Sequence, residues 1–331
     1  MSKKQNNEIS EVKETTAVKE QKIYDFCGKR KLVAILAVIF VILAIVGTLV
    51  LKVDVAIEFK GGTIITYNFE GSVNTDDIEK TISDTLGLKA NVGEGENIST
   101  GDKNITVQFT SKEGLTAEKQ NQLSKALEEK YPDNKFEILD SNDVNPTTGK
   151  EFFLKCLVAV AFAALLIIVY VAVRFKKIGG WPAGVCSVIA LFHDMLVVYV
   201  AFVFFGFEIN SNFMAVVLTI LGYSINNTIV IYDRIREDRA IMPKASLREI
   251  TNAGCTQSLT RSIRTTITTL GTMIVVSVVV YISGYTSLLS FSVPLIFGLI
   301  SGAYSSLFVS TTVWVAWLEK REAKAKAKKS K

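Results

Sequence analysis

The chain has 331 residues, of which 49% are hydrophobic, and its formal net charge is +5. A mean hydropathy of +0.32 is too high for an ordinary soluble enzyme and is typical of a polytopic membrane protein. Its single histidine excludes a Ser-His-Asp triad in the soluble part and a histidine metal cluster, and it has no Walker lysine loop, so we expect no enzymatic activity, cofactor or metal.

Six apolar segments are long enough to cross a bilayer, for which a helix needs about 20 apolar residues. They are Leu32–Leu51, Phe152–Val173, Trp181–Phe205, Phe213–Tyr232, Thr266–Ile282 with its flanks, and Leu289–Leu318. The first follows the hydrophilic residues 1–31 and precedes no small-x-small cleavage site, so we expect an uncleaved anchor over residues 32–51. Transmembrane helices 2 to 6 then lie within residues 151–318.

Basic residues predict the orientation of these helices. They occur before the first span, between the second and third, between the fourth and fifth, and after the sixth, whereas the connectors 206–212 and 283–288 contain no Lys or Arg. Because basic residues are enriched on the cytoplasmic side, we expect both termini inside, with a cytoplasmic segment 1–31, a loop 233–264 and a basic tail 319–331. Within that loop, an interfacial helix is expected over Ala245–Leu259. The tail could contact anionic membrane lipid or ribosomal RNA. A lysine-rich run of this kind is more often a solvated cytoplasmic anchor, so we do not expect nucleic acid as a partner.

Residues 52–150 form one long insertion that this topology puts outside the cell membrane. The insertion contains 11 Lys and 18 Asp plus Glu, a net charge of −7, and no cysteine. Its patterns predict strands over Val55–Phe59, Thr63–Phe69, Asn104–Thr110 and Lys135–Leu139, and helices over Thr75–Leu86 and Thr116–Tyr131. We interpret them as a βαββαβ order, and therefore as a ferredoxin-like α/β extracytoplasmic domain with its helices on one face of the sheet.

Two polar residues lie near the middle of the third span. Neighbouring residues on a helix point about 100° apart, so His193 and Asp194 are not expected to face one partner. We favour an interhelical hydrogen bond for His193. An aspartate at this depth either pairs with a cation or takes up a proton, which makes Asp194 a functional candidate.

Residues 222–239 carry the most informative motif. An apolar helix meets Asn226 and Asn227 and then ends in the charged residues Asp233, Arg234, Arg236 and Glu237, which can pair at i, i+3 or i, i+4 spacing. Lipid cannot hydrogen-bond amides, so Ser224, Asn226 and Asn227 must face other helices or water.

The run Gly222-Tyr223-Ser224-Ile225-Asn226-Asn227-Thr228 with the charged exit closely resembles the end of the fourth transmembrane helix in the SecF family. Three other segments are similar to the same family: Gly61-Gly62 after the first span, the stretch Leu259–Thr266 around Arg261, and Gly298–Ser306 in the sixth span. We interpret Gly61 and Gly62 as a tight turn or a close backbone approach, and Gly298-x-x-x-Gly302 as a packing face.

SecF is the smaller half of the SecD–SecF accessory complex of bacterial protein export, in the resistance-nodulation-division superfamily. The resemblance implies a SecD-like partner, because such transporters work as two pseudo-symmetric halves. It also implies a location in the bacterial cytoplasmic (inner) membrane and assistance to the SecYEG channel, drawing an unfolded polypeptide outward with the proton or sodium gradient. Two alternatives stay open: a small-molecule or lipid exporter half of the same superfamily, and a translocon scaffold without ion coupling.

The resemblance also locates candidate ion-coupling residues. Most family members carry aspartate at the position of Asn227, and asparagine cannot titrate. The remaining candidates are a carboxylate on the partner's matching helix, which we favour, and Asp194. Arg261 matches an arginine implicated in ion coupling in the family and could hold either carboxylate ionised, although it could equally be an arginine that snorkels at the membrane edge. The face around Ser224 and Asn226 is the expected contact with the partner.

Overall fold

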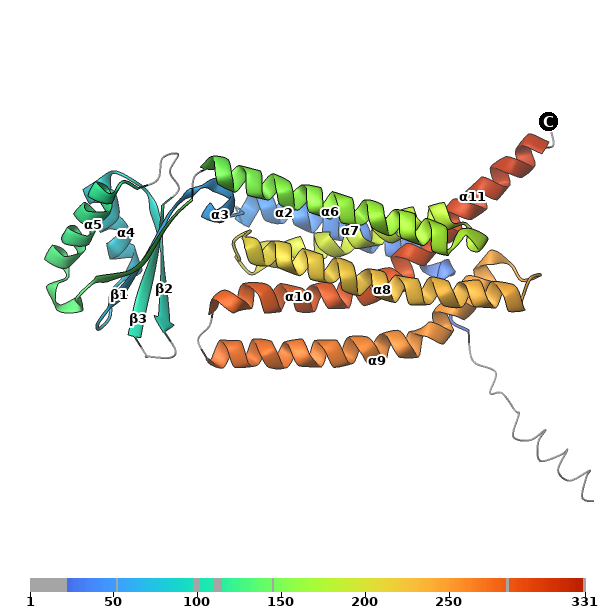
Figure 1. The fold of residues 1–331 in the computed structure, drawn as a ribbon. Coiled ribbons are helices and arrows are strands. Elements are labelled where there is room, and N and C mark those ends of the chain that lie inside the picture. Colours follow the sequence, from blue (N-terminus) through green and yellow to red (C-terminus); the bar gives the residue numbers. More distant parts are fainter. Residues whose placement is uncertain are drawn as a thin grey trace, which may run out of the picture.

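The computed structural model describes residues 23–51, 53–97, 102–109, 115–144, 146–283 and 286–329. Over these residues the protein is mostly helical, with a bundle of long helices and a small α/β domain at one end of it (Figure 1). The marked C-terminus and the start of the first long helix both lie at the bundle end away from the sheet.

Six helical stretches have the length and composition of membrane spans, so the six predicted spans are confirmed. The turn η1 (Cys27–Lys29) precedes the first of them, and η3 (Lys176–Ile178) joins the second to the third. The spans are α2 (Arg30–Leu51), α6 (Pro146–Arg174), α7 (Gly180–Phe204), α8 (Ser211–Ile241), α9 (Leu247–Ile282), and the continuous run of α10 (Thr286–Tyr304), the π-helix η4 (Ser305–Ser310) and α11 (Thr311–Lys329).

Helices α7, α8 and α10 form the centre of the bundle. In their most apolar stretches, 56% of α7, 50% of α8 and 61% of the last span are buried, against 11% for each of α2, α6 and α9. Polar side chains on the central helices must therefore find partners inside the protein, whereas the outer helices present apolar surface to lipid.

The region expected to form a cytoplasmic loop, residues 233–264, is mostly helical. Helix α8 continues to Ile241 and α9 begins at Leu247, after a capping box formed by Ser246 and Glu249. The helix predicted over Ala245–Leu259 is present from Leu247, as the first part of α9, and it buries Ile250 against the core. Its position at a membrane interface stays a prediction. Loss of hydrophobicity marks where a helix leaves the bilayer, but it does not end the helix.

The α/β domain contains one antiparallel sheet with the strand order β2-β3-β1-β4. Its elements are β1 (Gly62–Phe69), α4 (Thr75–Leu86), β2 (Ala90–Asn97), β3 (Asp102–Phe109), α5 (Ala117–Lys130), the turn η2 (Pro132–Asn134) and β4 (Glu137–Val144). The observed order is βαββαβ, as named in the prediction, but the strands that form it are not all the predicted ones. Both helices cover the same face of the sheet (Figure 1), and they bury Ile78, Ile82, Leu123 and Leu127 in one core.

Individual strands differ from the prediction. Strand β2 was not predicted, because Gly93 and Gly95 interrupt its apolar alternation. Strand β4 begins at Glu137 instead of Lys135, whose φ of 43° is incompatible with a strand. The predicted end of the third strand, Thr110, lies outside the described residues.

The segment 53–60 connects the domain to the bundle. Its predicted strand Val55–Phe59 is wrong, because Val55 forms only an isolated bridge with Ile209, in the loop before α8, and the short helix α3 (Ile57–Lys60) follows. The glycine pair then turns the chain into β1, with a φ of 80° at Gly61. A Cβ atom on Gly62 would lie 2.0 Å from the backbone oxygen of Phe109, so the close approach predicted for this pair is confirmed.

Candidate functional site

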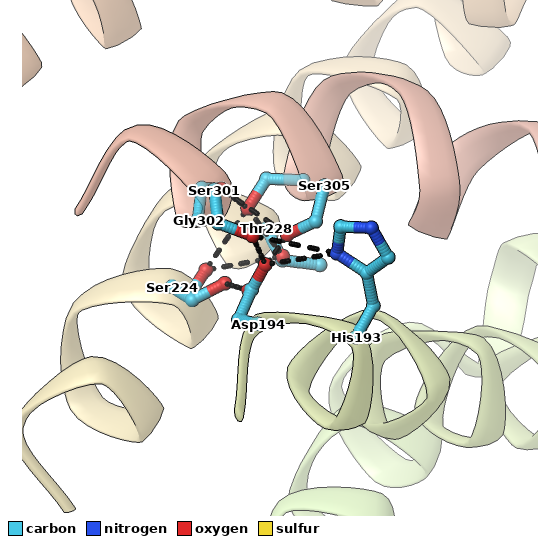
Figure 2. Close-up of polar contacts among 8 residues, drawn as sticks. His193, Asp194, Ser224, Thr228, Ser301, Gly302 and Ser305 are labelled. Carbon is cyan, nitrogen blue, oxygen red and sulfur yellow. Dashed lines mark hydrogen bonds and ion pairs between the residues drawn. The ribbon is translucent and has the colours of Figure 1, made fainter. Parts of the chain in front are cut away.

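Asp194 on α7 is fully buried in the centre of the bundle and accepts hydrogen bonds from three serine hydroxyls (Figure 2). Ser224 of α8 and Ser305 of η4 donate to Oδ2 at 2.6 and 2.7 Å, and Ser301 of α10 donates to Oδ1 at 2.6 Å. Distances this short are typical of hydroxyl groups that donate to a carboxylate. One carboxyl group therefore joins three central helices through neutral donors.

Two glycines on α10 allow this close packing. A Cβ atom on Gly298 would lie 2.6 Å from Cγ1 of Ile220, and one on Gly302 would lie 3.2 Å from Cβ of Ser224. The expected packing role of this glycine pair is confirmed. Ser301 and Ser305 are about one helical turn apart, so the close packing of this helix against α8 brings both hydroxyls to Asp194.

His193 is buried beside Asp194 and contacts the same serine. Its Nδ1 atom lies 3.4 Å from Oδ1 of Asp194 and 3.4 Å from Oγ of Ser301, while Nε2 has no hydrogen-bond partner among the described residues. The expectation that the two neighbours cannot face one partner is wrong, because Ser301 lies between their two directions. The imidazole also packs edge-on against Phe40 of α2, with ring centres 5.5 Å apart.

A row of buried hydroxyls extends from this cluster along α8, away from the sheet. The Thr228 hydroxyl donates to Oγ of Ser306 at 2.9 Å, and the Tyr232 hydroxyl lies 2.9 Å from Oγ of Ser310. Residues 224, 228 and 232 are spaced by four, so they face η4 together. A π-helical segment such as η4 interrupts the regular hydrogen bonds of a helix and is frequent at functional sites.

Arg261 lies on a different surface. Its side chain is exposed on α9 and lines a cavity of about 630 Å³ with Asp233, Arg234 and Glu237 of α8. Over the described part of the chain, the polar partners of Asp194 are His193 and the three serines. The expectation that Arg261 holds Asp194 ionised is therefore wrong, because Asp194 is central and α9 is at the edge of the bundle.

The polar residues of the α8 motif point in different directions. Asn226 is exposed, whereas Ser224 is fully buried against Asp194. Side chains two residues apart on a helix point about 200° away from each other, so Ser224 and Asn226 cannot lie on one face of α8. The partner surface expected around Ser224 and Asn226 is therefore wrong for Ser224.

Asn227 lies one helical turn after Tyr223 of α8, which contacts α9. The Tyr223 hydroxyl donates to Oγ1 of Thr266 at 2.9 Å. Asn227 is 6% exposed, and its Nδ2 group has no hydrogen-bond partner within the described ranges. A buried amide of this kind is available to a further acceptor.

The charged residues at the end of α8 form the pairs that their spacing predicts. Asp233 lies 2.7 Å from Arg236, and Arg234 lies 2.9 Å from Glu237. Asp233 also lies 3.0 Å from Arg174 at the end of α6, a contact between distant segments that spacing cannot predict.

Comparisons with known proteins agree with this arrangement. Residues 122–320 match the family described as "Protein export membrane protein SecD/SecF, C-terminal". The chain is 34% identical over 275 residues to "Protein translocase subunit SecF" of Alicyclobacillus acidocaldarius, covering 82% of this chain and 85% of that protein. It is 31% identical over 306 residues to "Protein translocase subunit SecDF" of Bacillus subtilis, covering 89% of this chain and 38% of that protein.

Solved structures give the same result. The crystal structure of SecDF, a translocon-associated membrane protein from Thermus thermophilus, is 27% identical with a TM-score of 0.73 and covers 90% of this chain. This chain spans only 39% of that SecDF chain. Both the sequence and the fold place it with these proteins, and the chain therefore belongs to the SecD/SecF family of protein export membrane proteins.

Proposed function

We propose that this chain is a SecF-type accessory subunit of the Sec protein translocase and works with a SecD-like partner to complete protein export. The support is its similarity over most of its length to a protein translocase subunit. SecDF relatives contain a matching region of about two fifths of a longer chain. A six-helix chain of this kind corresponds to one half of such a unit.

The surface proposed for the partner lies on α8 and α9. Gly222 and Asn226 are exposed one turn apart on α8, and no described atom lies within 4 Å of a Cβ atom built on Gly222. An exposed glycine permits close helix contact, and an exposed amide on a membrane span needs a hydrogen-bond partner. A helix of the SecD-like subunit satisfies both requirements.

We infer that the coupling ion, a proton or sodium, binds at this same interface. Asn227 cannot titrate, and the oxygens of Asp194 are already engaged by three hydroxyls. Arg261 is exposed and forms no ion pair with the described residues, so it is available to a carboxylate of the partner. Neutralisation of that carboxylate would release Arg261 and change the contact between the halves, while Asp194 serves as a secondary or structural site.

The α/β domain is proposed to be ferredoxin-like and extracytoplasmic, with both termini in the cytoplasm of a bacterial cell. Its position at the bundle end opposite to the C-terminus supports this orientation (Figure 1). There it would move against the unfolded polypeptide that leaves SecYEG, while the helices respond to the ion gradient.

Export into membrane vesicles tests the ion site, with the gradient-driven step measured after ATP-driven insertion. Arg261→Ala is expected to abolish most of the gradient effect. Arg264→Ala is the matched control, because it is equally an exposed arginine of α9 but does not line the α8–α9 cavity. Asn227→Ala is expected to reduce the gradient effect less than Arg261→Ala does. Asp194→Asn is expected to lower the stability of the protein more than it lowers the gradient effect.

The outcomes separate the alternatives. If Asp194→Asn alone abolishes the gradient effect in folded protein while Arg261→Ala is silent, the partner carboxylate is not the site. If all these variants respond to the gradient like the wild type, the chain acts as a scaffold without ion coupling.

A further inference from the structure

Two cavities lie at the bundle end away from the sheet, and Arg321 of α11 lines both. The first has a volume of about 510 Å³ and lies between the end of α6, the turn η3 and the start of α7. The second has a volume of about 550 Å³ and follows α11 from Val313 to Lys324. Both lie where membrane spans end, which is the depth of lipid headgroups.

The walls of these cavities are apolar on the membrane side. Val169 and Val173 of α6 line the first cavity and are 45% and 69% exposed. Trp181 in the first cavity and Trp317 in the second are 66% and 42% exposed. Exposed tryptophans at the ends of spans are typical of the membrane interface, where one side of the ring contacts acyl chains.

The opposite side of the cavities is basic. Lys176 and Arg321 line the first cavity, and Lys320, Arg321 and Lys324 line the second. No ion pair formed by the described residues involves any of these four side chains. The neighbouring Glu319 is already occupied by Arg30 and Arg248.

A close backbone contact fixes this arrangement. A Cβ atom on Gly180 would lie 2.0 Å from the backbone oxygen of Ala172, so the turn after α6 folds tightly back on that helix. A Cβ atom on Gly179 would lie 3.3 Å from a methyl group of Leu318. The turn therefore holds Lys176 on one side of the first cavity and α11, with Arg321, on the other.

We propose that these cavities form a binding site for an anionic phospholipid, with its phosphate between Lys176 and Arg321 and its acyl chains along Val169 and Val173. Basic pockets between spans suit such headgroups, because an anionic phosphate there gains charge-assisted hydrogen bonds. The apolar walls and the tryptophans favour a lipid over RNA, which would leave Val173 and Trp181 without apolar partners.

Tryptophan quenching by brominated lipid tests this site in the full chain. The chain has three tryptophans, and Trp314 is fully buried, so quenching reports Trp181 and Trp317. Nanodiscs of phosphatidylcholine receive increasing fractions of brominated phosphatidylglycerol or of brominated phosphatidylcholine. The anionic lipid is expected to reach half-maximal quenching at a fraction several times lower than the zwitterionic lipid.

Lys176→Gln with Arg321→Gln is expected to raise the anionic fraction at half-maximal quenching at least about fivefold, since the phosphate loses its two charge-assisted hydrogen bonds. Lys177→Gln with Lys328→Gln removes the same charge from exposed residues outside both cavities. This control should leave the anionic fraction at half-maximal quenching unchanged. An equal shift in the control, or equal quenching by both lipids in the wild type, would overturn the proposal. Displacement of the lipid by soluble glycerol phosphate or by RNA would overturn it as well.

Discussion

Ser224 on α8 donates its hydroxyl hydrogen to Oδ2 of Asp194 on α7 at 2.6 Å, and both side chains are fully buried. A carboxyl group removed from water is unfavourable unless its oxygens accept hydrogen bonds. The contact therefore stabilises the packing of two central helices. It also explains why α8 keeps a hydroxyl group on its inner face while Asn226 lies on its outer face.

Ser224→Ala is expected to lower the free energy of unfolding by about 2 kcal/mol, because it removes one donor from a fully buried carboxyl oxygen. Denaturant unfolding in detergent micelles measures the change. Ser277→Ala is the control, since its hydroxyl donates only to the backbone oxygen of Met273 in its own helix, and it should change stability by less than about 0.5 kcal/mol.

The same substitution in an Asp194→Asn background tests whether this hydrogen bond accounts for the loss. Ser224→Ala should then cost less, because an amide at residue 194 has one accepting oxygen where the carboxyl group has two. Equal losses in the two backgrounds would show that the loss does not arise from the contact with residue 194.

Gly298→Ala and Gly222→Ala are expected to have opposite effects. A Cβ atom at residue 298 would collide with Ile220, so this variant should lose about 1–3 kcal/mol of stability. Gly222 has open space around it, so alanine there should leave the isolated chain as stable or raise stability by up to about 1 kcal/mol. Co-purification with the SecD-like partner should nevertheless weaken for Gly222→Ala. Undiminished co-purification of this variant would show that the exposed face of α8 is not the partner surface.

The six spans could be predicted from the sequence because the bilayer requires a fixed length of apolar helix, and that signal is local. Helix ends were predicted less well, as the continuation of α9 through residues 247–259 shows, because a polar helix remains stable outside the bilayer. Strand β2 was missed because two glycines remove its alternation, although pairing with β3 determines the strand.

The candidate site was predicted in part. Asp194 could be identified because an acid within a span is rare. Its partners could not, because which helices meet at the centre is a tertiary property that one sequence does not contain. The spacing of Ser301 and Ser305 was a usable signal, since two hydroxyls one turn apart mark a polar face.

Cysteine labelling tests the proposed orientation. With the four native cysteines replaced by serine, Glu118→Cys in α5 should react from outside intact cells with an impermeant maleimide. Lys244→Cys, in the connector between α8 and α9, should react only after the membrane is permeabilised. Both residues are exposed, so accessibility within the protein is matched. The reverse labelling pattern would invert the orientation of the whole chain.

Glu208 lies in the loop between α7 and α8, beneath the α/β domain. Burial and then the neighbouring Asp54 raise the pKa of its carboxyl group, whereas Lys60 and a hydrogen bond with Gln108 of β3 act in the opposite direction. Glu58 of α3 adds a smaller repulsion. Glu208, Asp54, Lys60 and Gln108 line one cavity of about 470 Å³, between the domain and the bundle.

A carboxyl group with a raised pKa binds its proton more tightly in the folded protein than in the unfolded chain. Its ionised form therefore destabilises the fold above the folded pKa, and this penalty disappears as the pH falls through that value. Glu208→Gln keeps a hydrogen-bonding group toward Gln108 but cannot ionise. It should therefore raise the melting temperature relative to the wild type at about pH 8, and the difference should vanish at about pH 4, below the ordinary pKa of glutamate. Glu118→Gln, at an exposed glutamate of α5 outside this junction, is the control for the substitution itself. A Glu208→Gln variant that is less stable than the wild type at about pH 8 would show that the attraction of Lys60 outweighs burial at this junction.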